Sequence, residues 1–222
     1  MNLIQNTPGL TIDAEHAYSF SGARVPGVTE VLHGCGFVDT RWYTETHSSR
    51  GRAVHEVLAG TARGLTFDWE LLDVDLHGWT RSGVNFLSAI DADGGEILGV
   101  ETMLYHPLYA FAGTVDLIVR GWRGADWILD YKTGAVQKWV RFQTAAYGLL
   151  VQNLPEVAAR GKLLKRAAVE LDRDGARARI IEYNSVDHFN DGARFLAHLT
   201  THRDRALFGA RAAEPQPEAL PS

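Results

Sequence analysis

The chain has 222 residues, of which 45% are hydrophobic and 22% are charged, a composition typical of one well-packed globular domain. Its formal net charge of −5 argues against a protein that coats nucleic acid through bulk positive charge, but it allows an enzyme that binds a few phosphates locally. The single cysteine, Cys35, excludes an internal disulfide and a metal cluster held by cysteines alone.

Neither a membrane span nor a secretory signal is visible in the sequence. No stretch approaches the roughly 18 apolar residues of a transmembrane helix. The segment 1–6 lacks the basic start and apolar core of a signal peptide. We therefore expect an intracellular, cytoplasmic protein that does not associate with membranes.

The first third of the chain predicts irregular structure followed by helices. Glycine and proline interrupt residues 1–34, which indicates a small hairpin and then a helix starting at Val28, with Thr29 as a possible cap. Apolar residues recur at helical spacing over 50–62 and again over 76–90, so we expect two further helices there.

A sheet is predicted in the second half of the chain. Three segments rich in β-branched and aromatic residues, at 96–106, 110–120 and 126–132, indicate consecutive antiparallel strands. Two more strands, at 162–172 and 176–183, flank Asp174-Gly175, a strong hairpin signal.

Two helices complete the pattern, one over 136–153 with Trp139 on its buried face and one that Ser185 caps and that runs towards Arg205. The order of elements predicts the α/β class, as an α+β sandwich with a mixed central β-sheet flanked by helices. We expect a single domain over 1–209 and a disordered, proline-containing tail over 210–222.

Acids interrupt two neighbouring apolar strands. Side chains alternate along a strand, so Asp130 and Lys132 share a face, and Asp116 on the preceding strand can lie beside Asp130. Two carboxylates suit a hard cation such as Mg²⁺ or Mn²⁺, and Lys132 could position a water or stabilise a transition state. The alternative is a structural ion pair between the strands.

These motifs resemble the PD-(D/E)XK nuclease superfamily, in its RecB-like and Cas4-like exonuclease branch, which includes the mitochondrial genome maintenance exonuclease. Gly-Thr-Val-Asp ending at Asp116 and Asp-Tyr-Lys-Thr-Gly from Asp130 match the central signature. Gln143 and Tyr147 match a downstream Gln-x-x-x-Tyr motif, and four residues apart they share a helix face. The order Val-Thr-Glu-Val-Leu, then Arg-Gly-Arg-Ala-Val-His, agrees as well. No iron–sulfur cluster is expected, because its cysteines are missing.

The resemblance implies a restriction-endonuclease-like core and an assignment of roles. The metal ligands would be His55, Asp116, Asp130 and Tyr131. The catalytic group would comprise Lys132, Asp116, Asp130, Gln143, Tyr147 and Glu101, the last as the acid of the first strand, although a solvent-facing glutamate fits almost equally well.

The expected substrate is DNA, bound by basic and aromatic residues beside the motifs. Candidate contacts are Arg50, Arg52, Lys138, Arg141, Gln143 and Tyr147. Lys162, Lys165, Arg166 and Arg203 are weaker candidates, since a solvated face explains them equally well. Trp42, Tyr43 and Trp139 are possible stacking platforms for single-stranded bases, with core packing the alternative for Trp139.

The implied function is that of a metal-dependent deoxyribonuclease, an exonuclease acting from a free end of single-stranded DNA in repair, recombination or replication. Two alternatives remain open. One is a module on a nuclease fold that binds DNA ends or a recombination partner without cutting, and the other is a dimeric endonuclease. The sequence gives no protein partner and no cleavage polarity.

Overall fold

A mixed five-stranded sheet forms the centre of the molecule in a computed structural model that describes residues 3–38, 45–152, 154–158 and 164–209. Its strand order is β4-β5-β6-β7-β8. All neighbours are antiparallel except β6 and β7, which run parallel, so the predicted mixed sheet is confirmed. The strands are β4 (Glu96–His106), β5 (Phe111–Arg120), β6 (Asp126–Lys132), β7 (Leu164–Glu170) and β8 (Arg179–Tyr183).

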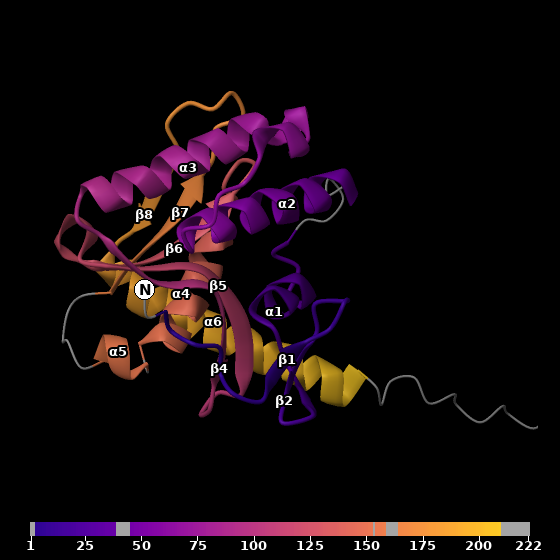
Figure 1. The fold of residues 1–222 in the computed structure, drawn as a ribbon. Coiled ribbons are helices and arrows are strands. Elements are labelled where there is room, and N and C mark those ends of the chain that lie inside the picture. Colours follow the sequence, from indigo (N-terminus) through magenta and orange to yellow (C-terminus); the bar gives the residue numbers. More distant parts are fainter. Residues whose placement is uncertain (1–2, 39–44, 153, 159–163, 210–222) are drawn as a thin grey trace, which may run out of the picture.

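Helices cover both faces of this sheet (Figure 1). The first face packs against α2 (Glu45–Ala62) and α3 (His77–Ala92), and the second against α1 (Val28–Gly34), α4 (Val140–Val151) and α6 (Ser185–Gly209). The short α5 (Pro155–Ala158) follows α4 on the crossover from β6 to the parallel β7. This is the predicted α/β sandwich.

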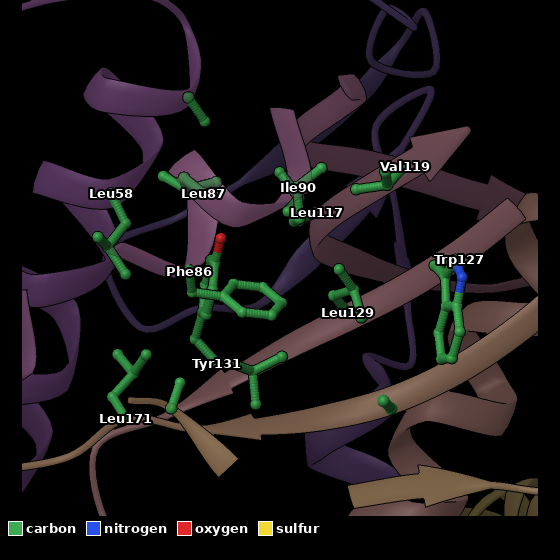
Figure 2. Close-up of a cluster of buried hydrophobic side chains, with 14 of the residues drawn as sticks. Leu58, Phe86, Leu87, Ile90, Leu117, Val119, Trp127, Leu129, Tyr131 and Leu171 are labelled. Atoms are coloured by element: carbon green, nitrogen blue, oxygen red, sulfur yellow. The ribbon is translucent and has the colours of Figure 1, made fainter. Parts of the chain in front are cut away.

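The hydrophobic core is divided between the two faces because successive side chains of a strand point to opposite sides. Leu117, Leu129 and Tyr131 pack towards α2 and α3, where Leu58 and Phe86 meet them (Figure 2). Ile118 and Ile128 point the other way, into the cluster formed with α1, α4 and α6. None of the helices in the described part of the chain is long and apolar enough to cross a membrane.

The N-terminal hairpin is more extensive than the sequence indicated. Strands β1 (Leu10–Ile12), β2 (Tyr18–Phe20) and β3 (Ala23–Val25) form a second, antiparallel sheet. It packs on the end of the main sheet through a cluster with Ala112, and Phe20 stacks on Tyr105 with ring centroids 4.0 Å apart. The small sheet is therefore anchored to β4 and β5.

Several helix boundaries differ from the expectation, among them the start of α2, which lies at Glu45 rather than at residue 50. Gly27, not Thr29, caps α1, and the Glu30 carboxylate accepts a hydrogen bond from the Gly27 N–H at 3.2 Å. Helix α4 begins at Val140 rather than residue 136, after a short irregular segment. The predicted turn at Asp174-Gly175 is confirmed, with Gly175 at φ +85°. Residues 210–222, predicted to be a disordered tail, lie outside the described residues.

Candidate active site

Three side chains from three elements meet at the border between α2 and the sheet. His55 comes from α2, Glu101 from β4 and Asp116 from β5, and one ligand atom of each lies within 4.8 Å of the others. His55 Nδ1 is 3.5 Å from Asp116 Oδ2 and 3.6 Å from Glu101 Oε1. The fully buried Val54 and Leu58 fix α2 in the core, which directs His55 towards the sheet. We call these three residues the His–Glu–Asp group.

Glu101 reaches the group through an unusual backbone conformation. Val100 pairs with Leu117 and Thr102 with Val115, so Glu101 stands opposite Asp116 in the register. Its φ of +47° is left-handed, which costs a non-glycine residue roughly 1–2 kcal/mol. Arg63 donates a hydrogen bond of 2.8 Å to the carbonyl of Val100, beside the strained residue. Strain of this kind is typical of functional sites.

Asp116 is positioned by the neighbouring strand. The ladder between β5 and β6 extends to Leu117 and Leu129, and beyond it the buried Asp116 Oδ2 accepts a hydrogen bond of 2.8 Å from the Tyr131 N–H. Burial raises the pKa of Asp116, although the positive charges of His55 and Lys132 oppose this shift. The carboxylate is therefore held in place by main chain, with one oxygen close to His55.

The two carboxylates of the group also shift the pKa of His55. Burial alone would lower the pKa of His55, but the negative charges of Asp116 and Glu101 outweigh it and raise the pKa to about 9. In the absence of a cation the imidazole is thus protonated at neutral pH. Its positive charge then compensates the two carboxylates, which a bound cation would otherwise do.

Asp130 and Lys132 form an ion pair beside the group, as the strand alternation predicted. The Asp130 carboxylate is only 1% exposed, and burial raises its pKa to about 6 despite the opposing charge of Lys132. Asp116 is close enough to raise the pKa of Asp130 further. Within the described chain, neither Asp130 carboxylate oxygen has a hydrogen-bond partner apart from this ion pair. Asp130 lies next to the His–Glu–Asp group rather than in it.

Tyr131, which the family resemblance placed among the metal ligands, contributes main chain rather than side chain to this arrangement. Its N–H binds Asp116, whereas the ring packs in the core beside Leu58 and Phe86 (Figure 2). The ring stands edge-on to the His55 imidazole, with centroids 5.7 Å apart. The buried phenol oxygen has no hydrogen-bond partner among the described residues.

Gln143 and Tyr147 interact on one face of α4, as their spacing predicted. Gln143 Nε2 donates to the Tyr147 hydroxyl at 2.9 Å, and both side chains are buried. Burial, together with the charges of Asp130 and Asp116, raises the pKa of Tyr147 well above its usual value. The hydroxyl therefore stays neutral, and because it already accepts from Gln143, its own hydrogen is left to donate.

A cavity of about 1150 Å³ opens over these residues. The His–Glu–Asp group, Lys132 and Tyr147 line it, together with basic and aromatic side chains from α2 and the N-terminal sheet. The lining residues that sequence reasoning missed include His16, Tyr18 and Arg63. For Arg63 the helical spacing from Arg52 and His55 could have indicated a shared face, but no sequence signal brings the N-terminal hairpin to the site.

The predicted DNA contacts fall into two classes. Arg50, Arg52 and Trp139 line the cavity, and the exposed Lys138 lies between the lining residues Gln137 and Trp139. The Arg50 guanidinium also lies 4.4 Å from the centre of the Trp79 ring. Trp42, Tyr43 and Lys162 lie outside the described residues.

The basic residues of the second class bind other parts of the protein and do not line the cavity. Arg141 pairs with Asp187 at 2.9 Å and with Asp191 at 2.8 Å, both on α6. Arg166 is only 1% exposed and pairs with the same Asp191, so its assignment to a solvated or phosphate-binding face was wrong. Lys165 pairs with Glu182, and Arg203 donates to the carbonyls of Tyr109 and Ala110.

Comparison with known proteins identifies the same fold family. A family model described as the PD-(D/E)XK nuclease superfamily matches residues 68–219, more than half of the chain. No curated protein matches the sequence. The matched region excludes α2 and the N-terminal sheet, although both line the cavity.

One solved structure agrees at the level of the fold, and two further matches superpose less well. A protein from Eubacterium rectale, named provisionally as an exonuclease, superposes with a TM-score of 0.51 at 12% identity, covering 89% of this chain and 91% of that one. The alkaline exonuclease LHK-Exo from Laribacter hongkongensis gives a TM-score of 0.30 at 15% identity, covering 85% and 95%. LHK-Exo in complex with dAMP gives 0.37 at 14% identity, covering 85% and 93%.

Proposed function

Because the chain belongs to the PD-(D/E)XK nuclease superfamily, we propose that it is a divalent-metal-dependent deoxyribonuclease that removes nucleotides from a free end of single-stranded DNA. A role in DNA repair, recombination or replication follows from such an activity. The observation that carries the proposal is the convergence of His55, Glu101 and Asp116 within 4.8 Å in a large open cavity.

The donor set fits Mg²⁺ or Mn²⁺. Carboxylate oxygens are the preferred ligands of both ions, and the imidazole adds one nitrogen donor to them. The buried Asp130 carboxylate is paired with the Lys132 ammonium and lies close to Asp116, so its oxygens offer further ligand atoms. His55, Glu101, Asp116 and Asp130 would hold the ion, which lowers the pKa of a bound water and offsets charge on the scissile phosphate.

The remaining site residues supply positioning and positive charge. Lys132 lines the cavity beside Asp130, where its ammonium can stabilise negative charge that develops on the phosphate. Tyr147 can donate its hydroxyl hydrogen to a phosphate oxygen while Gln143 holds the hydroxyl in place. Arg50, Arg52 and Arg63 on α2 and at its end line the same cavity and provide charge for the DNA backbone.

A time course on end-labelled DNA tests this function. Linear single-stranded DNA should be degraded with Mg²⁺ or Mn²⁺, whereas closed circular single-stranded DNA and linear duplex should survive the same conditions. Asp116→Asn serves as the matched control for contaminating nuclease.

Other outcomes would support other functions. Rapid cutting of the circle would favour an endonuclease, and a dimeric mass in solution would strengthen that conclusion. DNA binding without cutting, in both metals, would favour the non-catalytic module.

A further inference from the structure

A second cavity, of about 330 Å³, adjoins the first. Three residues, His16, Tyr18 and Tyr147, line both cavities and therefore stand where the two meet. Val28, Thr29 and Gly113 contribute to the far wall of the smaller one. We call the smaller cavity the side chamber.

The N-terminal sheet builds the entrance of the side chamber as a rigid feature. The turn between β1 and β2 is closed by Asp13, whose N–H donates to the Ala17 carbonyl at 3.1 Å and whose Oδ1 accepts from the Ala17 N–H at 2.8 Å. His16 occupies the left-handed region in this turn, at φ +60°, and its side chain is exposed. A histidine held in a strained conformation at the mouth of a cavity is an arrangement typical of a ligand clamp.

Tyr18 connects the entrance to the proposed metal site. Its hydroxyl is 2.8 Å from Thr114 Oγ1, and its ring is 8% exposed. Thr114 precedes Asp116 by two residues on β5, so about 7 Å of strand separates the two positions. Burial raises the pKa of Tyr18, and the charges of Glu101 and Asp116 add to the shift.

The lining of the side chamber suits a nucleoside. Two aromatic rings, Tyr18 and Tyr147, offer surfaces on which a base can stack. Glycines at 27 and 113 keep the walls free of side chains; a Cβ on Gly27 would lie 3.0 Å from the Tyr18 ring. Glu30, which also lines the chamber, is paired with Arg24 and with His202, so its charge is partly compensated.

We propose that the side chamber binds the base and sugar of the DNA nucleotide adjacent to the scissile phosphodiester, with His16 contacting that nucleotide at the entrance. His16 and Tyr18 are then substrate-positioning residues supplied by the N-terminal sheet. The proposal rests on the proposed function, since it names a subsite for the same DNA strand.

Abasic scanning of DNA binding tests the subsite. Short single-stranded oligonucleotides, each lacking one base at a different distance from the end, are bound in EDTA and followed by fluorescence anisotropy. For the wild type, one abasic position should weaken binding by about tenfold, the effect of losing one stacked base. Affinity plotted against abasic position then has a minimum at that position, which we call the dip. Thr29→Trp, which fills the chamber from its exposed wall, and His16→Ala should flatten this dip. Glu15→Ala changes the same turn outside the cavity lining and should leave the dip intact.

Each outcome decides one of the two proposals. If every abasic oligonucleotide binds like the intact one, or if the dip persists unchanged in Thr29→Trp and His16→Ala, the subsite is overturned. If the dip behaves as expected but the wild type cuts no DNA with Mg²⁺ or Mn²⁺, the nuclease function fails, and the side chamber remains as a base-binding subsite of a non-catalytic module, without a scissile bond beside it. Cleavage assays add a further check, because a positioning role for His16 predicts a raised KM with kcat within about twofold.

Discussion

Lys132 and Asp130 share one face of β6 and form an ion pair. Asp130 is buried, whereas the Lys132 side chain is 21% exposed and lines the large cavity. Asp130 lies close enough to Asp116 for the charges of the two carboxylates to interact. Tyr147 lines the cavity from α4, and Gln143 donates a hydrogen bond to its hydroxyl.

Replacing Lys132 separates chemistry from binding. Loss of one charge-stabilising group at such a site typically lowers the rate by about 100- to 1,000-fold, so Lys132→Ala should slow single-turnover cleavage by this factor and change DNA affinity little. Tyr147→Phe removes only a hydroxyl and should have a smaller effect. Normal turnover with poor DNA affinity in Lys132→Ala would instead identify the lysine as a phosphate anchor.

The raised pKa of His55 predicts a pH dependence of stability in the metal-free protein. The folded pKa is about 9 and the unfolded value about 6.5. The folded state therefore holds the proton more tightly, and stability present below pH 6.5 is lost as the pH rises to 9. In EDTA we expect the melting temperature to fall by about 5 °C between pH 7 and pH 9.

A variant and a metal provide the controls for this measurement. In His55→Gln, most of the fall in melting temperature between pH 7 and pH 9 should disappear. Saturating Mn²⁺ should reverse the direction of the pH dependence, because metal binding requires the deprotonated imidazole. A decline of the same size in His55→Gln would show that another group is responsible.

At the scale of elements, α4 is held to the sheet by buried charges. Arg166 on β7 donates to the Arg141 carbonyl and to Thr144 Oγ1, both on α4, and pairs with Asp191 on α6. Arg141 itself pairs with Asp191 and Asp187. This network fixes the position of α4, and with it the face that carries Gln143 and Tyr147.

Breaking the network should affect stability more than DNA affinity. Removing one partner of a buried ion pair costs about 3–5 kcal/mol, so Arg166→Met should lower the melting temperature by about 10 °C. Arg141→Ala should destabilise less, because Arg141 is partly exposed, and should leave the affinity for single-stranded DNA within about twofold. A large loss of affinity at unchanged stability would return Arg141 to the DNA-binding surface.

The sequence predicted most elements and the proximity of Asp116, Asp130 and Lys132, because strand alternation and helical spacing are local properties. His55 and Glu101 were singled out only through the family resemblance. The sequence could not predict the left-handed backbone of Glu101, which depends on the pairing of β4 with β5. The partner of Arg141 lies fifty residues away on α6. Likewise the bond between Tyr18 and Thr114 joins residues 96 positions apart. Contacts of this range follow from packing and leave no periodic signal.

For the whole molecule, a net charge of −5 coexists with four basic side chains in the lining of the cavity. These are Arg50, Arg52, Arg63 and Lys132, and they stand beside the acids of the site, Glu101 and Asp116, and beside Glu56. Binding of single-stranded DNA should therefore depend on a few local phosphate contacts. This distribution also explains why the overall charge alone gives no indication of a nucleic-acid substrate.

Salt dependence measures these contacts. With three to four phosphates neutralised, the logarithm of the binding constant should fall against the logarithm of salt concentration with a slope of about −2 to −3. Arg52→Ala should reduce the slope by about 0.7. Arg177→Ala, an exposed arginine outside the cavity lining, should leave it unchanged. Equal effects of both variants would mean that the cavity is not where the strand binds.

The most direct test of the central claim is the single-turnover rate at which end-labelled linear single-stranded DNA is cleaved with Mn²⁺ by the wild type, Asp116→Asn and Glu101→Gln. We expect cleavage by the wild type, none in EDTA, and a loss of at least about 1,000-fold in Asp116→Asn, with Glu101→Gln also impaired. Both variants should stay folded, as checked by their melting temperatures in EDTA. Cleavage by Asp116→Asn at nearly the wild-type rate, or full activity in EDTA, would contradict the assignment of this site.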